Sequence, residues 1–342
     1  MWSINSHLSN VILMRGVSMK QTCVTIIILM LLGNLSSCEA QPQYEIFNVL
    51  LGTDSKSPVL LKTSATDRYT AEYQFDEMVF CSSTDFSSAS VGQQIESVYP
   101  YEDCVVITFT APLVPGERVS VNGKVADRSG NSLTFTAGVW GVNERVPQVQ
   151  INEFSTKGSG NNPDRVELIA LSSGNLAGVT LYHGMPESFD SEYIFPSVEV
   201  DKGDYIVIVY SEEPSGSIPL EFAGGVVGLG ANNGVISLCE RPEGTVVDAV
   251  LYSNRTSSSD DTYGGFGTSK VYQWVQELEI SGEWGSGLLV PESGIDSTNH
   301  TATRTFCRTE GKADTNTKSD WHIVPTRGAT FGAQNITEIY NP

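Results

Sequence analysis

Residues 149–154 read VQINEF, and residues 164–170 read DRVELIA. Apolar and polar side chains alternate along both stretches, so that one side of each segment is apolar. A period of two places successive side chains on opposite faces of a strand, and the pattern therefore predicts strands with one buried face. Segments 202–209, 233–238 and 244–252 continue the series with valine and isoleucine, which favour strands.

The first half of the chain has the same character. Residues 71–75 alternate, residues 105–109 are rich in β-branched side chains, and turns are expected at Asn122-Gly123 and at residues 129–131. Turns that recur about every 8–12 residues are typical of a β-sandwich. Because the chain also contains 32 glycines and 15 prolines, we expect an all-β protein with two sandwich domains in tandem.

The N-terminal region has the layout of an export signal. A short positive start at Met19 and Lys20 precedes an apolar run at residues 24–32, and residues 35–38, LSSC, follow it. This order is typical of a bacterial lipoprotein processing site. The apolar run is about half as long as the roughly 20 residues of a membrane-spanning helix.

We therefore expect residues 1–37 to be a leader whose true start is Met19. The mature chain then begins at Cys38, which is the expected lipid attachment site, for palmitate among other acyl chains, and the membrane anchor. The alternative is an ordinary secreted protein that is cleaved near Ala40.

The chain is strongly acidic, with a formal net charge of −20. Without residues 1–37 it has 18 basic and 40 acidic side chains, a net charge of −22. Such a field repels phosphate backbones and anionic lipid head groups, so we expect no nucleic-acid partner. Basic residues do gather near the C-terminus, interspersed with acids: Arg304, Arg308, Lys312, Lys318 and Arg327.

Four cysteines remain beyond Cys38, one pair in each half of the chain. Export to an oxidising compartment predicts the disulfides Cys81–Cys104 and Cys239–Cys307, although two other connectivities stay open. A metal site formed by these cysteines is disfavoured, because no CxxC spacing or histidine cluster accompanies them.

Two family resemblances follow from the motifs. Residues 73–79, YQFDEMV, and residues 119–133, VSVNGKVADRSGNSL, resemble bacterial immunoglobulin-like domains over residues 41–142. The resemblance implies an immunoglobulin-like β-sandwich at residues 38–145 with a spacer or presentation role and no chemistry.

The second half resembles the bacterial lamin-tail domain, another immunoglobulin-like sandwich. The resemblance rests on the strand series that opens with residues 149–154 and on a closing series at residues 303–305, 314–321 and 325–335. It implies a second domain at residues 146–342, in which Arg327 replaces the usual proline and residues 330–333 interrupt the final motif. An insertion at residues 256–300 exceeds the pattern, and its apolar residues fit either a short helix or a strand: Val271, Trp274, Val275 and Leu278.

The motifs of catalysis are missing from the sequence. His183, His300 and His322 have no metal-ligand spacing, and we expect each to be exposed or at a rim. Asp314, Asn316 and Asp320 form a weak calcium candidate, for which a capped turn is the competing interpretation. We therefore predict no metal and no cofactor. Aromatic residues are expected either to fill the cores or to form a binding face: Trp140, Trp274, Trp284, Trp321, Tyr263 and Phe266.

Taken together, these features predict a non-enzymatic, lipid-anchored bacterial envelope lipoprotein. We expect a structural, adhesion or partner-binding role with a protein or carbohydrate partner, at the outer membrane, the cell surface or the periplasmic face. The alternative function is an accessory component of an extracellular nuclease or phosphoesterase system, because bacterial lamin-tail modules occur beside such enzymes.

Overall fold

The computed structural model describes residues 54–254, 263–285 and 287–342. The expected leader and the lipid-bearing Cys38 lie outside the described residues. Contacts divide the chain into two units, Met1–Lys56 and Ser57–Pro342, and the fold below is that of the second unit.

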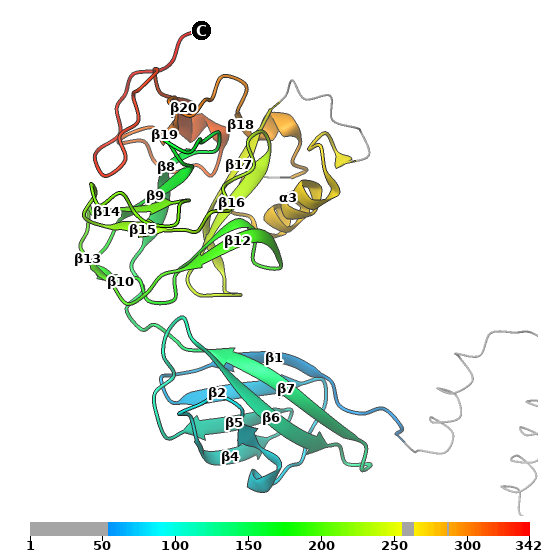
Figure 1. The fold of residues 1–342 in the computed structure, drawn as a ribbon. Helices are drawn as coiled ribbons and strands as arrows, with labels where there is room; N and C mark the ends of the chain where they lie inside the picture. The colour runs from blue at the N-terminus through cyan, green and yellow to red at the C-terminus, as the bar shows by residue number, and fades with distance from the viewer. Residues whose placement is uncertain (1–53, 255–262, 286) are drawn as a thin grey trace, which may run out of the picture. The chain divides into compact units, whose positions relative to one another are not determined.

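The described residues from Leu60 to Trp140 form one pair of sheets (Figure 1). The four-stranded sheet has the order β1-β2-β5-β4, with β1 (Leu60–Ala65), β2 (Thr70–Phe75), β4 (Ile95–Tyr101) and β5 (Cys104–Phe109). The three-stranded sheet has the order β3-β6-β7, with β3 (Ser87–Ser88), β6 (Arg118–Ala126) and β7 (Ser132–Trp140), and the 3-10 turn η1 (Ser83–Asp85) precedes it. Tyr73, Phe109 and Val121 are among the fully buried residues between the two sheets.

One predicted turn is wrong. Asn122 and Gly123 lie inside the continuous strand β6, and Gly123 pairs with Phe135 of β7. The hairpin turn lies at residues 127–131, where Gly130 has φ +93° and Asp127 Oδ1 accepts the amide of Asn131 at 2.8 Å. Gly123 is needed in the strand because a β-carbon there would lie 2.5 Å from the Phe135 ring.

Residues from Val149 onward form the second pair of sheets. The six-stranded sheet has the order β15-β14-β9-β8-β19-β20, with β8 (Val149–Ser155), β9 (Arg165–Ala170), β14 (Tyr205–Val209), β15 (Glu221–Ala223), β19 (Phe306–Arg308) and β20 (Trp321–Ile323). The five-stranded sheet has the order β12-β11-β16-β17-β18, with β11 (Thr180–Met185), β12 (Ser188–Ile194), β16 (Gly234–Cys239), β17 (Val246–Ser253) and β18 (Ile295–Asp296). A two-stranded ribbon of β10 (Gly174–Asn175) and β13 (Glu199–Val200) and the 3-10 turns η3 (Pro291–Ser293) and η4 (Lys318–Asp320) complete the unit.

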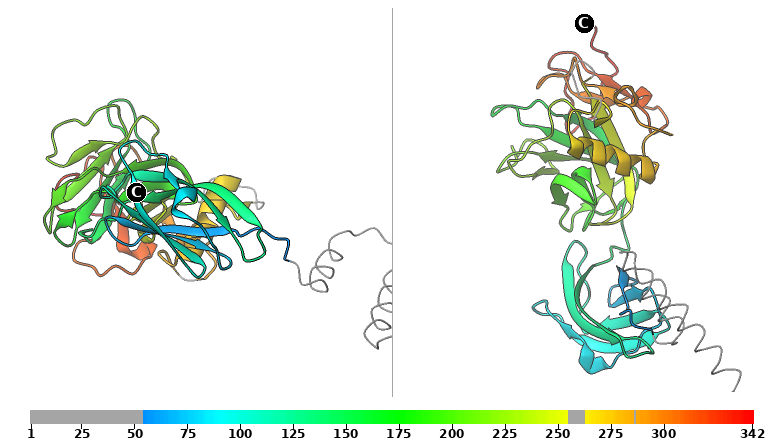
Figure 2. Two further views of the ribbon diagram at one scale, coloured as in Figure 1. Left: turned by 90° about the horizontal axis from the view of Figure 1, so that it is seen from below. Right: turned by 90° about the vertical axis from the view of Figure 1, so that its right-hand side faces the viewer.

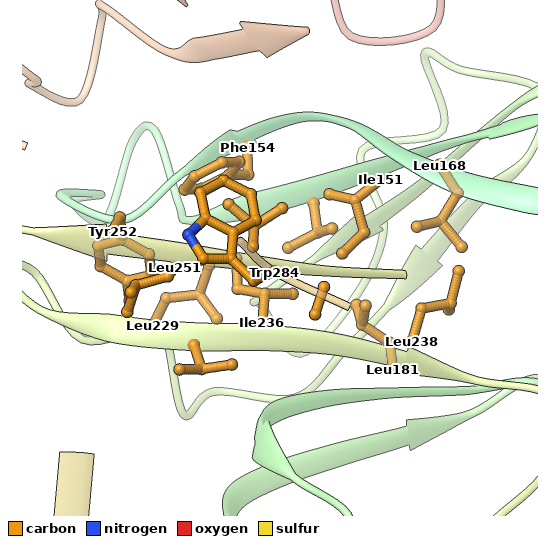
Figure 3. Close-up of a cluster of buried hydrophobic side chains, with 14 of the residues drawn as sticks. Ile151, Phe154, Leu168, Leu181, Leu229, Ile236, Leu238, Leu251, Tyr252 and Trp284 are labelled. Carbon is orange, nitrogen blue, oxygen red and sulfur yellow. The ribbon is translucent and has the colours of Figure 1, made fainter. Parts of the chain in front are cut away.

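The core of this part lies between the two sheets. Figure 3 shows Ile151, Phe154 and Leu168 of one sheet facing Leu181, Ile236 and Leu238 of the other. Phe154 also stacks on Phe306 with ring centroids 4.6 Å apart. The all-β fold class predicted from alternation is therefore confirmed.

The insertion contains a helix, α3 (Ser269–Ser281), which lies along the five-stranded sheet (Figures 1 and 2). Its buried residues have helical spacing: Val271, Trp274, Val275 and Leu278. The Thr268 side chain caps its first turn, and Gly282 ends it with φ +75°. Helical spacing therefore prevails over the β-propensity of the same residues.

The predicted disulfides are not formed, and the structure has all four residues as free cysteines. Cys81 packs against the first core, whereas Cys104 alternates with the buried Val105 and so lies on the outer face of β5. Cys239 and Cys307 belong to different sheets. The prediction paired the cysteines by their positions in the chain. It is wrong because strand alternation and sheet order decide where a thiol lies, whereas distance along the sequence does not.

Candidate functional site

A polar site of the second sandwich lies where β8 and β17 run next to each other. Asp248 of β17 reaches across to β8, and its Oδ2 accepts the amide of Ile151 at 2.6 Å. Arg308 of β19 donates from Nε to the carbonyl of Ile151 at 2.9 Å, and its Nη2 lies 3.2 Å from Asp248 Oδ2. The side chains of Asp248 and Arg308 thus take the place of a neighbouring strand, because they form the hydrogen bonds of the Ile151 amide and carbonyl.

Both side chains of this ion pair are buried. The guanidinium of Arg308 lies over the Trp321 ring, 4.7 Å from its centroid, and its Nη1 is 2.8 Å from Asp314 Oδ1. Burial raises the pKa of Asp248 to about 7, although the charge of Arg308 and the amide of Ile151 oppose the rise. Arg308 is enclosed in this way, so it is not part of an exposed basic face with the other basic residues near the C-terminus.

A groove of about 670 Å³ lies beside this cluster. One side is the continuous stretch of residues 146–150, of which Val149 and Gln150 belong to β8, and the other side is residues 246–248 of β17. Four carboxylates line it, and no lysine or arginine is among its lining residues: Glu240, Asp248, Glu283 and Asp314. Its volume falls within the roughly 300–1,000 Å³ range of small-ligand pockets.

A second cluster buries two glutamates under the C-terminal segment. Glu153 of β8 and Glu167 of β9 are opposite each other in the strand register, and both are 0% exposed. The amide of Thr330 donates to Glu153 at 2.9 Å, and the amide of Gly332 donates to Glu167 at 2.5 Å.

Asn335 completes this closure. Its Nδ2 donates to the carbonyl of Arg308 at 2.9 Å and to Asn152 Oδ1 at 3.1 Å. Burial raises the pKa of Glu167 to about 8, against the hydrogen bonds from Gly332 and Asn152, and burial also raises the pKa of Glu153. The cluster holds the C-terminal segment on the sheet and is closed to ligands.

The weak calcium candidate has its oxygens engaged elsewhere. Asp314 pairs with Arg308, and Asp320 is 1% exposed and accepts the amide of Thr315 at 2.8 Å. Burial opposes ionisation of Asp320, but the hydrogen bonds from Thr315 and Thr317 dominate and lower its pKa. Asn316 lies between them with φ +53°. This geometry is that of a capped turn.

The prediction of exposed histidines is wrong, because all three are buried. His183 Nε2 accepts the amide of Gly230 at 3.1 Å, and burial lowers the pKa of His183 to about 4. His300 stacks on Phe306 with centroids 4.3 Å apart, and burial lowers its pKa to about 3. His322 lies 3.1 Å from the carbonyl of Ile336, and burial lowers its pKa as well.

The aromatic residues divide between core and surface. Phe266, Trp274, Trp284 and Trp321 are buried in the second core, as expected for core filling. Trp140 and Tyr263 are half-buried. The groove therefore contains none of the aromatic residues that the sequence singled out.

A comparison with known families matches the second half of the chain. A family model described as "protein second domain" matches residues 147–219 and 225–323. The chain belongs to this second-domain family. The match begins just before β8 and ends at the last residue of β20.

Individual relatives are distant. An uncharacterized protein of Treponema pallidum (strain Nichols) is 22% identical over 186 residues, which cover 48% of this chain and 45% of that protein. The chain thus spans less than half the length of this relative. The N-terminal part of the bacterial S-layer protein SbsC is 15% identical, with a TM-score of 0.25 over 58% of this chain and 44% of that chain. A second SbsC structure, rSbsC, has 12% identity and a TM-score of 0.24, over 58% of this chain and 41% of its own.

Proposed function

We propose that the protein is a non-enzymatic, lipid-anchored lipoprotein of the bacterial envelope that binds a macromolecular partner in a structural or adhesive role. The observation that carries a binding role is the groove beside β8 and β17, where strand edges, apolar side chains and carboxylates are open to a ligand. Binding by strand edges needs no catalytic group, because main-chain hydrogen bonds supply the affinity.

The buried polar groups support a structural role over a catalytic one. His183 and His300 each accept a backbone amide on Nε2, and their low pKa values keep both rings neutral at physiological pH. A general base needs a nitrogen that is free to reach a substrate. These two histidines stabilise loops instead.

We also propose that the second sandwich is a lamin-tail-like module. The segments that carry the resemblance come together in space: β8 and β9 lie side by side, and Asn335 of the closing motif bonds Asn152 of the opening motif. The opening and closing motifs thus meet in one hydrogen-bonded cluster, which supports an architecture shared with the lamin-tail domain.

The anchor rests on the leader and on Cys38. In the part of the chain that the structure describes, no helix has both the length and the apolar character to cross a bilayer. The proposed attachment is therefore tested directly, with labelled palmitate and membrane fractionation of cells that express the full chain. Cys38→Ala should lose label and membrane retention, and Cys23→Ala, in the leader, is the matched control.

Unchanged labelling of the Cys38→Ala protein would contradict the proposed lipid anchor. Protease treatment of intact cells then separates a surface position from a periplasmic one. Incubation of the purified chain with DNA and phosphodiester substrates tests the non-enzymatic assignment, and turnover that a chelator abolishes would contradict it.

A further inference from the structure

We propose that the groove beside β8 and β17 binds an extended peptide rich in lysine or arginine, which pairs with the edge of β8 as an added strand. This inference rests on the proposed binding function and names the class of its partner. Three features of the groove carry it: an open strand edge, an apolar floor and an acidic rim.

The open edge follows from the hydrogen bonds of Ile151. Its amide and carbonyl face away from β9, because Asp248 and Arg308 bond them. Backbone groups two residues apart on a strand face the same side, so the amide and carbonyl of Val149 also face the groove. Strand β19 pairs with β8 only at Glu153 and Phe154, and so it stops short of Val149.

The other wall of the groove is also a strand edge. On the side away from β16, β17 pairs with β18 at Tyr252 and Ser253, and no other strand of the described residues pairs with the end at Val246. Val247 is 42% exposed at this end. We assign the pairing to β8 because the backbone groups of Val149 face the groove, and because the chain lines the groove continuously over residues 146–150, through β8 and the segment that leads into it.

The floor and the rim define the chemistry of the peptide. Val146, Leu171 and Val247 are 36%, 41% and 42% exposed and supply apolar surface for every second side chain of an added strand. Arg308 already pairs with Asp248 and Asp314. Glu240 and Glu283 have longer contacts, 3.7 Å to Arg241 and 3.4 Å to Asn316, and so they are the carboxylates best placed for a ligand. Both are half-buried, so their attraction for a cation is less screened than that of a fully exposed pair.

The test uses the full mature chain and three dye-labelled heptapeptides, with binding followed by fluorescence anisotropy. The first peptide alternates lysine and valine, the second alternates glutamate and valine, and the third is the lysine peptide with alternate backbone amides N-methylated. We expect the lysine peptide to bind and the other two to bind at least about tenfold more weakly, because one lacks the charge and the other cannot pair as a strand.

Two kinds of variant test the location. Glu240→Gln combined with Glu283→Gln should weaken the lysine peptide about threefold to tenfold, whereas Glu212→Gln with Glu213→Gln, at exposed sites outside the groove, should not. Val149→Pro removes an amide that faces the groove while leaving the pairing with β9 possible, and it should abolish strand addition. Circular dichroism shows whether each variant is folded, and the glutamine pair decides the matter if the proline variant is not.

Three outcomes would overturn the inference: no binding of the lysine peptide, equal binding of the N-methylated peptide, or equal binding to the glutamine pair. Equal binding of the N-methylated peptide would mean attraction to the mature chain's net charge of −22 and no strand addition. Palmitate labelling and protease accessibility are measured separately, so the groove assignment and the envelope assignment fail independently.

Discussion

Glu153 and Glu167 lie opposite each other on β8 and β9, both fully buried, and each accepts a backbone amide from the C-terminal segment. Polar residues on the outer face of a sheet normally meet water. Here the residues after Thr330 cover them, so the last part of the chain is a structural component of the sandwich and not a tail.

The first prediction concerns pH. Because burial raises the pKa of Glu167 from 4.5 to about 8, the folded protein keeps a proton that the unfolded chain releases. This contribution to stability is complete below the unfolded pKa and is lost as the pH rises through the folded pKa. We expect the free energy of unfolding to be about 2 kcal/mol lower at pH 9 than at pH 6 in urea titrations.

Glu167→Gln should reduce that dependence, because the amide does not titrate, and should leave the part that comes from Asp248, whose pKa burial raises to about 7. Glu213→Gln at an exposed site should leave the dependence unchanged. The same slope in wild type and Glu167→Gln would show that another group is responsible.

The second prediction concerns the closure at the C-terminus. Asn335→Ala removes donors to Arg308 and Asn152 and leaves buried acceptors without a partner, which should cost about 1–3 kcal/mol of stability. Asn341→Ala, at an exposed position six residues on, is the control and should change stability little. Thermal unfolding measures both, and equal melting temperatures would mean that the segment does not contribute.

The third prediction concerns the buried ion pair. Arg308→Met leaves the Asp248 carboxylate buried without its cation and should destabilise by about 3–5 kcal/mol. Asp314→Asn removes the partly exposed acid on the other side of the same guanidinium and should cost about 1 kcal/mol or less. Urea unfolding ranks the two, and a larger loss in Asp314→Asn would contradict the geometry.

The fourth prediction concerns the first sandwich. Gly123→Ala places a β-carbon 2.5 Å from Phe135 and 2.7 Å from Phe86, and overpacking of this kind should cost about 1–3 kcal/mol. Gly160→Ala meets no atom within 4 Å and is the matched control. If Gly123→Ala is as stable as the control, Gly123 is not packed closely against Phe135 and Phe86.

The fifth prediction concerns the thiols. Because Cys81, Cys104, Cys239 and Cys307 are free, alkylation of the unfolded, unreduced protein should modify all four. In the folded protein, Cys239 should react slowly, since burial raises its pKa to about 12. Peptide mass spectrometry identifies the alkylated cysteines. A cross-linked pair of peptides would contradict the free thiols and support a disulfide.

Particular residues show how far sequence reasoning reached. The alternation in residues 166–170 predicted β9, and the spacing of Val271, Trp274, Val275 and Leu278 contained the helix, because local periodicity reflects which side of a segment meets the core. The strand through Gly123 was missed, since Asn-Gly is a local turn signal and the rings that exclude a β-carbon there come from β7 and from Phe86.

The candidate site was hardly visible from the sequence. Asp248, Arg308 and Ile151 are far apart in the chain and meet only through the order of strands, so no motif marks them. Glu153 and Glu167 stand in the two stretches quoted first, but no motif in the sequence marks them as a buried pair. Asn335 was a usable signal for them, because it belongs to the closing motif of the resemblance.

By itself the sequence determined an all-β chain, the series of strands in its second half, and the acidity of the chain, because composition and period-two patterning act locally and add along the chain. Only the tertiary structure decided which thiols stay apart, which carboxylates lose their water and where a strand edge stays open. Those properties depend on the order of strands in each sheet and on the segment that covers its outer face, and both arise from contacts between residues that are distant in sequence.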